Sequence, residues 1–330
     1  MKSQATLKKI AEHLNLSIST VSRALKDHPD VAGETIRRVK DLADLLNYEP
    51  NAFAVNLRQK HSNIYAIIVP ELAGFFYNSF IDAVEEEAQQ RGYNIMVLQT
   101  REDPAIEENN LKLCRYNHVA GIFVAITRHT NDFTPFVKTM ETEIPIVFFD
   151  KVPDEAGFPS VSIADEEMGA LAAEKIIHSG KSKILAIMGN QALSITHRRE
   201  SGFRSVIEKN AQISLSWVYS ESETQAYDTI MNLPADDLKD LVVFCMSDEL
   251  LCGVMQAFYE RKVSIPEDVG VLSMSNGFFP KLFNPPVSYV ETSGYQLGKL
   301  SFTCMLDLID GVEYLSEVML RGGYIENASL

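Results

Sequence analysis

The stretch "LKKIAEHLNLSISTVSRAL", from Leu7 to Leu25, predicts two short helices that meet at a tight joint. Apolar residues recur at helical spacing through its first half, directly after Thr6, which is a suitable N-cap. The joint is Asn15-Leu16, and Ser17 can cap the second helix. Three residues of that helix face inward: Val21, Ala24 and Leu25. A third apolar stripe, from Ile36 to Leu46, predicts a third helix that ends near Pro50.

Three short helices with a tight first joint are typical of a helix-turn-helix module, whose second helix enters the DNA major groove. The outer face of the second predicted helix carries Ser19, Thr20, Ser22 and Arg23. Short hydroxyls and one Arg can approach base edges and phosphates closely, whereas a bulky or acidic face could not. A small helical interaction domain with a serine-rich solvent face would show the same pattern, so the pattern alone leaves both interpretations open.

The net charge is divided unevenly along the chain. The 330 residues hold 30 Lys and Arg against 45 Asp and Glu, for a formal charge of -15. Residues 1–61 carry ten basic and seven acidic residues, which gives +3, and the remainder carries -18. A mildly basic head on an acidic body permits phosphate contact at one end and discourages nonspecific binding to DNA elsewhere.

The body alternates between apolar runs and amphipathic stretches. The runs read as buried parallel strands in two rounds: "IYAIIV", "YNIMVL", "GIFVAI" and "IPIVFFD", then "ILAIMG", "SWVY", "LVVFCM" and "VGVLSM". Alternation of strand and helix predicts doubly wound parallel sheets, and two rounds predict two similar lobes. We expect the chain to cross between the lobes near Asp150 and Ser288. Ligands of such sheets bind beyond the carboxyl ends of the strands, in the cleft between lobes.

Length and composition narrow the class of protein. A chain of this length suggests two or three domains with a sizeable core. The four cysteines form no metal-binding spacing and are interpreted as buried thiols in a reducing compartment. No signal segment or apolar run of about 18 residues is found, so we expect a cytoplasmic protein that does not enter membranes.

The run "TLKKIAEHLNLSISTVSRALKDHPDVAGETIRRVKDLADLLNYEPNAFAVNLR" resembles the headpiece and hinge of the LacI/GalR family of bacterial transcription repressors. The similarity has no gap through "TVSR", the loop and "NYEPN". It continues in order through "RRESGF", "SDELLCGVMQAF", "IPEDVGVLSM" and "NPPVSYVET", as far as Arg321. The body also resembles periplasmic sugar-binding proteins, and the head and the absence of a signal segment favour the regulator.

The resemblance implies an α-helical helix-turn-helix headpiece joined to an α/β core of two doubly wound parallel-sheet lobes, as in periplasmic binding proteins. The headpiece spans residues 1–50, a hinge helix or linker spans 51–61, and an effector-binding and dimerisation core spans 62–330. Lobe 1 covers about 62–162 and 291–321. Lobe 2 covers about 163–290 and 322–330.

Carried over by position, the resemblance implies which residues contact DNA. Ile18, Ser19 and Arg23 occupy base-reading positions, and apolar Ile18 suits a thymine methyl group. The phosphate-contacting positions are Ser17, Thr20, Ser22, Thr35, Tyr48 and Asn51. Leu7 also belongs to the expected DNA-binding set.

The segment "NAFAVNLR", from Asn51 to Arg58, is too short to form a stable helix alone. In the family this segment folds into a hinge helix on DNA, where paired Leu side chains wedge into the minor groove. Leu57 holds the wedge position and Ala54 accompanies it, although an exposed linker Leu is the alternative. Val55 stands where the family often has Arg, which weakens the expected contact with phosphates.

The expected effector contacts follow strands of the body. By resemblance, Arg199 in "HRRESGF" matches an effector-clamping Arg, and Phe76 and Tyr77 hold aromatic positions that line the pocket. Asp150 closes one strand and Asp248 opens the helix after another. Asp or Arg can grip vicinal hydroxyls or a carboxylate through charge-assisted hydrogen bonds. The alternatives are a surface Arg, ordinary lobe core for the aromatic residues, and an N-cap role for Asp248.

One departure from the family concerns the pocket. The family usually has a carboxylate where this chain reads "SMSN", so Ser275 and Asn276 take that place in the expected effector set. Ala125 likewise stands where a polar residue is frequent. The residues alone leave both a sugar and an anionic effector open.

The leading hypothesis is a sequence-specific DNA-binding regulator, most simply a repressor, that acts as a homodimer on a pseudo-palindromic operator and responds to a carbohydrate-like small molecule. The alternative is a cytosolic small-molecule-binding protein whose head no longer binds DNA. An enzyme is disfavoured, because the glycines form no dinucleotide-binding or P-loop motif and no nucleophile elbow is found. We therefore expect no catalytic residue, no metal and no cofactor.

Overall fold

The computed structural model describes residues 6–46, 48, 61–72, 74–153, 157–312 and 317–330. The chain divides into two compact units, Met1–Ser62 and Asn63–Leu330. Within the described ranges, no helix is long and apolar enough to cross a membrane. In the same ranges, no group of three or more His, Cys, Asp and Glu side chains could hold a metal ion.

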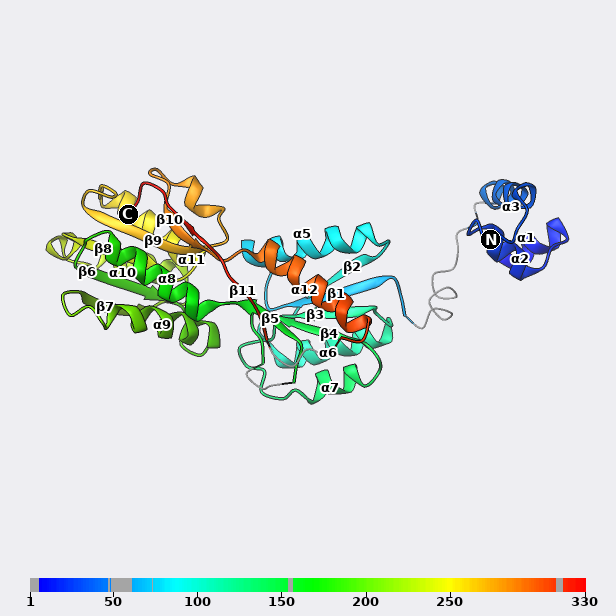
Figure 1. Cartoon of the computed structure of the whole chain (residues 1–330), viewed down its shortest axis with the longest axis horizontal. Coiled ribbons are helices and arrows are strands. Elements are labelled where there is room, and N and C mark those ends of the chain that lie inside the picture. Colours follow the sequence, from blue (N-terminus) through cyan, green and yellow to red (C-terminus); the bar gives the residue numbers. More distant parts are fainter. Residues whose placement is uncertain (1–5, 47, 49–60, 73, 154–156, 313–316) are drawn as a thin grey trace. The chain divides into compact units, whose positions relative to one another are not determined.

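The described residues of the first unit form three helices, α1 (Leu7–Leu14), α2 (Ile18–Ala24) and α3 (Gly33–Leu45), as the sequence predicts (Figure 1). The Thr6 side chain accepts a hydrogen bond from the Lys9 N–H at 3.3 Å and so caps α1. Ser17 caps α2 by accepting from the Thr20 N–H at 3.1 Å. The helices enclose a small core of Ile10, Ala11, Val21, Ala24, Val39 and Ala43.

The described residues of the second unit form two six-stranded sheets. The first has the order β11-β5-β4-β3-β1-β2, and the second has the order β12-β10-β9-β8-β6-β7. All neighbouring strands are parallel except β10 and β12, which are antiparallel. The strands of the first sheet are β1 (Ile64–Val69), β2 (Asn94–Gln99), β3 (Gly121–Val124), β4 (Ile146–Phe149), β5 (Ser160–Ile163) and β11 (Val318–Leu320). Those of the second are β6 (Lys183–Met188), β7 (Ser214–Tyr219), β8 (Leu241–Cys245), β9 (Val269–Ser275), β10 (Ser288–Glu291) and β12 (Tyr324–Ile325).

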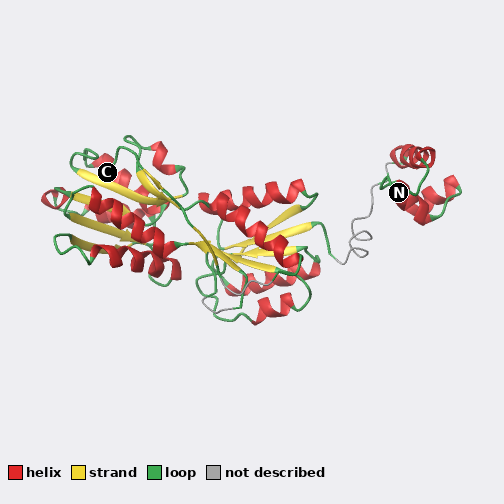
Figure 2. Ribbon diagram, in the orientation of Figure 1, coloured by secondary structure: helices red, strands yellow, loops and turns green. Residues whose placement is uncertain are grey.

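Helices cover both faces of the first sheet (Figure 2). They are α5 (Phe75–Gln90), α6 (Pro104–Tyr116), α7 (Thr134–Met140) and α12 (Gly294–Ile309). Alternate residues of β1 enter two separate cores, because successive side chains of a strand point to opposite faces. Ile67 packs in the core that contains Phe80 of α5 and Phe302 of α12. Ile68 packs in the core that contains Leu111 of α6. This sheet and its helices are called the first lobe.

The second sheet and its helices form the second lobe. The helices are α8 (Asp165–His178), α9 (Ser194–Ile207), α10 (Glu223–Met231) and α11 (Asp248–Glu260), with short 3-10 turns at Ala235–Leu238 and Phe279–Leu282. A Cβ atom at Gly202 of α9 would lie 1.8 Å from the Glu166 carbonyl oxygen of α8. Only glycine permits this close backbone contact, which holds α9 directly against α8.

Of the two crossovers that the strand pattern predicts, the one near Asp150 differs from the structure. At Asp150 the chain returns to the first sheet as β5, and it enters the second lobe only after Ile163. Ser288 begins β10, and the return follows Glu291. A third crossover joins β11 to β12. The crossover near Asp150 was a wrong prediction, because the four-residue strand "SVSI" alternates with serine and shows no apolar run.

Candidate functional site

Helix α2 presents a polar face to solvent. Val21 and Ala24 are fully buried in the head core, whereas Ser19 and Arg23 are exposed and Ile18 is 50% exposed. Ile18 stands at the first position of the helix and is not among the described residues that pack against the head core. The exposed side of α2 therefore suits contact with another surface, and hydroxyls beside one Arg suit base edges.

The other predicted DNA-binding residues surround α2 within the head. The Ser17 hydroxyl lies 2.8 Å from both the Ser19 and the Thr20 hydroxyls, so the three form one hydroxyl cluster at the start of the helix. Ser22 and Thr35 are half-buried on α2 and α3. Leu7 and Tyr48 pack partly against the head core, and burial raises the pKa of Tyr48. The remaining members, Asn51, Ala54 and Leu57, lie outside the described residues, as does Val55.

A cavity of about 450 Å³ lies between the two lobes of the second unit. Much of its lining comes from segments that directly follow strands, at the carboxyl ends of both sheets. Glu71 follows β1, Ser220 follows β7, and Thr292 follows β10. Six of the seven predicted effector residues line this cavity: Phe76, Tyr77, Asp150, Arg199, Asp248 and Asn276.

Asp150 presents a carboxylate that is already oriented. Its φ of +58° places it in the left-handed region, directly after β4. The Tyr77 hydroxyl donates a hydrogen bond to Asp150 Oδ2 at 2.8 Å. Burial raises the pKa of Asp150, and burial together with the neighbouring Asp150 charge raises the pKa of Tyr77. Tyr77 thus serves both as lobe core and as the support of a cavity carboxylate.

Arg199 is held from behind the cavity. It is only 6% exposed, its Nε donates to Asp165 Oδ1 at 2.7 Å, and its Nη1 donates to the Met246 carbonyl oxygen at 2.9 Å. The close contact of α9 with α8 at Gly202 brings Arg199 beside Asp165, which is the first residue of α8. These contacts exclude the surface-helix interpretation of Arg199. A guanidinium fixed in this way can present its remaining N–H groups to a ligand.

Asp248 is not an N-cap. Ser247 caps α11 by accepting from the Leu250 N–H at 3.4 Å, and the Asp248 carboxylate turns elsewhere. It accepts hydrogen bonds from the Ser275 hydroxyl and, at 3.0 Å, from the Asn276 N–H. Ser275 is 1% exposed and is not among the lining residues, so it supports Asp248 from within the lobe. Ala125, noted for its unusual position, is fully buried.

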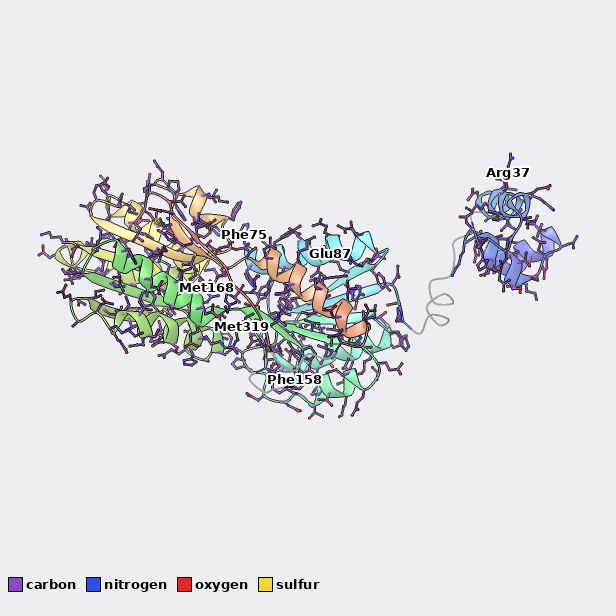
Figure 3. The ribbon with its side chains drawn as sticks, viewed as in Figure 1. Arg37, Phe75, Glu87, Phe158, Met168 and Met319 are labelled. Atoms are coloured by element: carbon purple, nitrogen blue, oxygen red, sulfur yellow. The ribbon has the colours of Figure 1, made fainter. Side chains whose placement is uncertain are left out.

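Asn276 bridges the lobes rather than pointing freely into the cavity. Its side-chain amide donates to the Ser79 hydroxyl at 2.6 Å and accepts from the Gly294 N–H at 2.8 Å. Phe75 lies at the junction of the two lobes (Figure 3). Its ring stacks on Phe278 of the second lobe with the ring centroids 4.8 Å apart. The substituted "SMSN" segment therefore contributes lobe-to-lobe contacts, which no sequence pattern indicates.

Several lining residues were missed in the sequence. They are Glu71, Glu102, Arg128, Lys151, Ser220, Glu221, Glu223 and Glu249. Lys151 Nζ lies 2.7 Å from Glu102 Oε1, and the Arg128 N–H donates to Glu102 Oε2 at 2.7 Å. Burial acts to raise the pKa of Glu102, but these hydrogen bonds outweigh it and leave the pKa lowered. The sequence signal that could have identified these residues was their place in the chain, since most of them follow a strand within a few positions.

Comparison with known proteins relates both units to described families. Residues 6–51 match the family model "Bacterial regulatory proteins, lacI family". Residues 63–320 match the model "Periplasmic binding proteins and sugar binding domain of LacI family". The HTH-type transcriptional repressor PurR of Actinobacillus pleuropneumoniae serotype 3 is 27% identical, over 96% of this chain and 97% of that protein. The PurR repressor of Pasteurella multocida is also 27% identical, over 93% and 92%.

Solved structures show the same fold at low sequence identity. The Lac repressor dimer bound to operator and the anti-inducer ONPF superposes with a TM-score of 0.87 at 20% identity, over 99% of both chains. The complex of the transcriptional regulator CelR with cellobiose superposes with a TM-score of 0.68 at 22% identity, over 98% of this chain and 99% of that one.

A helix-turn-helix unit joined to a two-lobed core of the periplasmic-binding-protein type defines a ligand-responsive class of DNA-binding regulator. Within that class, the chain belongs to the LacI family of bacterial transcriptional regulators, with a DNA-binding domain and an effector-binding domain. The relatives are transcriptional repressors, and the family is not enzymatic.

Proposed function

We propose that this protein is a dimeric transcriptional repressor that binds a pseudo-palindromic operator through α2 and is controlled by a small molecule bound between its lobes. The observation that supports this proposal is the cavity at the carboxyl ends of both sheets. It occurs in a chain whose other unit exposes a polar helix face. Residues 1–50 would read DNA, 51–61 would form the hinge, and 62–330 would bind effector and dimerise. A dimer is required because two half-sites need two heads. Such a regulator acts in the cytoplasm.

In this proposal Ile18, Ser19 and Arg23 read base edges, because they are the exposed residues of α2. Arg is the commonest partner of guanine in the major groove, and Ile18 offers an apolar surface to a thymine methyl group. The hydroxyl cluster of Ser17, Ser19 and Thr20 supports phosphate contact at the same end of the helix. Leu57 and Ala54 of the hinge would enter the minor groove.

The effector is proposed to be a carbohydrate-like molecule. Oriented carboxylates at Asp150 and Asp248 and the fixed guanidinium of Arg199 suit hydroxyl groups, and Phe76 and Tyr77 suit the apolar face of a sugar ring. Among structures of the same fold, CelR holds cellobiose, and a regulator from Alkaliphilus metalliredigens holds D-xylulofuranose. The effector would bias closure of the lobes and thereby the DNA affinity of the heads.

The proposal is tested by selecting DNA from a random pool with the full chain and measuring its affinity by fluorescence anisotropy. A recovered pseudo-palindrome is expected, and Arg23→Ala should weaken its binding by about 1–3 kcal/mol and relax one base position in each half-site. Arg37→Ala is the matched control. Arg37 lies on α3 and points away from α1 and α2, and its substitution removes the same charge from the head (Figure 3).

Two results would contradict the proposal. An Arg23→Ala protein with unchanged sequence preference would remove α2 as the reading element. A full chain that shows no salt-dependent affinity for any DNA would favour the alternative, a small-molecule-binding protein whose head no longer binds DNA.

A further inference from the structure

Aromatic rings join the two lobes directly at the edge of the cavity. Phe75 is the first residue of α5 in the first lobe, whereas Phe278 and Phe279 follow β9 in the second lobe. The Phe75 and Phe278 rings stack with their centroids 4.8 Å apart and their planes 13° from parallel. The Phe279 ring meets the Phe75 ring edge-on, at a centroid distance of 4.7 Å. One ring of the first lobe is therefore held by two rings of the second.

The local backbone brings the second-lobe rings to α5. Asn276 anchors the start of the segment, because its side chain donates to the Ser79 hydroxyl at 2.6 Å and accepts from the Gly294 N–H at 2.8 Å. Gly277 follows with a φ of +88°, a left-handed conformation that other residues rarely adopt. The chain therefore turns directly after its anchor, and the next two residues are the rings that contact Phe75.

The ring stack can separate when the lobes move apart. Gly294 begins α12 just after the crossover from β10, so its hydrogen bond with Asn276 lies at a hinge. Phe75 instead follows β1 within the first lobe, where the chain does not cross to the second lobe. Phe75 is 42% exposed and Phe278 is 47% exposed, so the stack is outside the buried core and either ring can enter water at modest cost.

We infer that the stack of Phe75 on Phe278 is a latch between the lobes, which holds the cavity shut in the absence of effector and so sets how readily it opens. Its effect on DNA binding rests on the proposed function, whereas its effect on the lobes does not. Phe75 lines the cavity and Phe278 does not. A ligand that contacts Phe75 can therefore strengthen or break the latch, and Phe278 tunes the response without contacting the ligand. A ligand shifts such an equilibrium only through contacts that differ between the two states, and the latch is an element of that kind.

Cys252 provides a reporter of cavity opening in the full chain. It lies on α11, lines the cavity and is partly buried, whereas the other three cysteines are buried. Burial and nearby carboxylates raise the pKa of Cys252 to about 11, so the reactive thiolate is scarce while the lobes stay together. The rate at which the neutral reagent dithiodipyridine modifies this thiol at pH 8 therefore rises with the open population. The Cys252→Ser variant should lose the reaction, which identifies the reporting thiol.

Phe278→Ala should speed modification of Cys252 about fivefold, which corresponds to the loss of about 1 kcal/mol from one aromatic pair. Phe278→Tyr keeps a stacking ring and should restore the original rate. The matched control is Tyr116→Ala, which removes an 80% exposed ring and should leave the rate unchanged. Tyr116 ends α6 just before β3, at the opposite end of the first sheet from the cavity. An unchanged rate in Phe278→Ala would overturn the inference.

A double-mutant cycle separates a latch from a change of access to the cavity. Phe75→Ala should also speed the reaction, and adding Phe278→Ala to it should change the rate by less than about twofold, because the stack is already lost. A full fivefold effect in both backgrounds would mean that Phe278 acts without Phe75, which contradicts the latch. Reaction of all four thiols would indicate unfolding. Phe278→Leu, which keeps the apolar volume, then replaces Phe278→Ala in the same comparison.

Two parallel measurements place the result. Size-exclusion chromatography should show the same oligomeric state for Phe278→Ala and the unchanged chain, and a lost oligomer would assign the ring to a contact between copies instead. Operator affinity should change in Phe278→Ala by at most the same factor for each protomer, since the lobe equilibrium can transmit no more. An unchanged operator affinity would overturn control of DNA binding by the latch. A chain that binds no DNA but shows the rate changes keeps the latch and loses the proposed function.

Discussion

Replacing Asp165 with Asn should strongly destabilise the second lobe. The Asp165 and Arg199 side chains are 3% and 7% exposed and are joined by a 2.7 Å hydrogen bond. The substitution keeps the shape of residue 165 and removes its charge. Arg199 would remain charged and buried, because a guanidinium does not lose its proton in a protein.

Removing one partner of a buried ion pair costs about 3–5 kcal/mol. The lower end of that range applies here for two reasons. Arg199 also donates to the Met246 carbonyl oxygen, and the carboxylates of Asp150 and Asp248 lie close enough for Arg199 to act on their pKa values. We therefore expect a loss of about 3 kcal/mol. With a denaturant slope of about 3 kcal/mol/M in urea, the midpoint falls by about 1 M.

The single tryptophan provides the readout. Trp217 lies on β7 in the second lobe, edge-on to Phe203 of α9 at 5.7 Å and beneath the Arg204 guanidinium at 4.1 Å. Its fluorescence during urea titration of the full chain reports unfolding of the packing that holds Arg199. The control is Glu167→Gln, which breaks the solvent-exposed pair with Arg321 and should leave the midpoint nearly unchanged.

The opposite substitution checks the reasoning. Arg199→Met leaves Asp165 without its cation, but burial already raises the pKa of Asp165, so the carboxyl can take up a proton. Its stability should therefore be closest to that of the unchanged protein at low pH and should fall as pH rises through that raised pKa. A midpoint shift below about 0.3 M for Asp165→Asn, or equal pH-independent losses in the two variants, would refute the buried-pair reasoning.

Three further predictions concern other parts of the chain. Ser17→Ala should cost the head about 1 kcal/mol through loss of the α2 cap, seen as roughly fivefold faster amide exchange in α2, and unchanged exchange would refute it. Tyr77→Phe should lower the urea midpoint, because Asp150 loses its donor at a cost of about 1–2 kcal/mol, whereas Tyr116→Phe, at an 80% exposed residue, should not. Burial raises the pKa of Glu107 to about 7, so stability should fall as pH rises from about 5 to 8. Glu107→Gln should reduce that fall by on the order of 3 kcal/mol, and a fall of unchanged size would place its cause elsewhere.

The head was predictable because its signals are local. Thr6 and Ser17 cap helices three residues or fewer from the groups that they bind, and the apolar stripes repeat at helical spacing. The long apolar strands were predictable for the same reason, since β1 and β8 are buried along nearly their whole length. The short strands β5 and β10 were missed, because neither contains an apolar run: serine alternates along β5, and β10 has only Tyr-Val between Ser288 and Glu291.

The cavity was predictable in position but not in chemistry. The rule that ligands bind at the carboxyl ends of parallel strands placed Asp150 and Asp248 correctly beside it. The partners of these residues were not predictable, because they come from distant segments. Asp165 meets Arg199 across 34 residues, and Asn276 meets Ser79 across 197 residues. Such contacts depend on helix packing and lobe placement, which single-sequence periodicity does not encode.

The acidity of the body bears on both proposed partners at once. The chain after residue 61 carries a net charge of -18, which repels the phosphate backbone and leaves DNA contact to the mildly basic head. The same field raises the local concentration of a cationic ligand and lowers that of an anionic one.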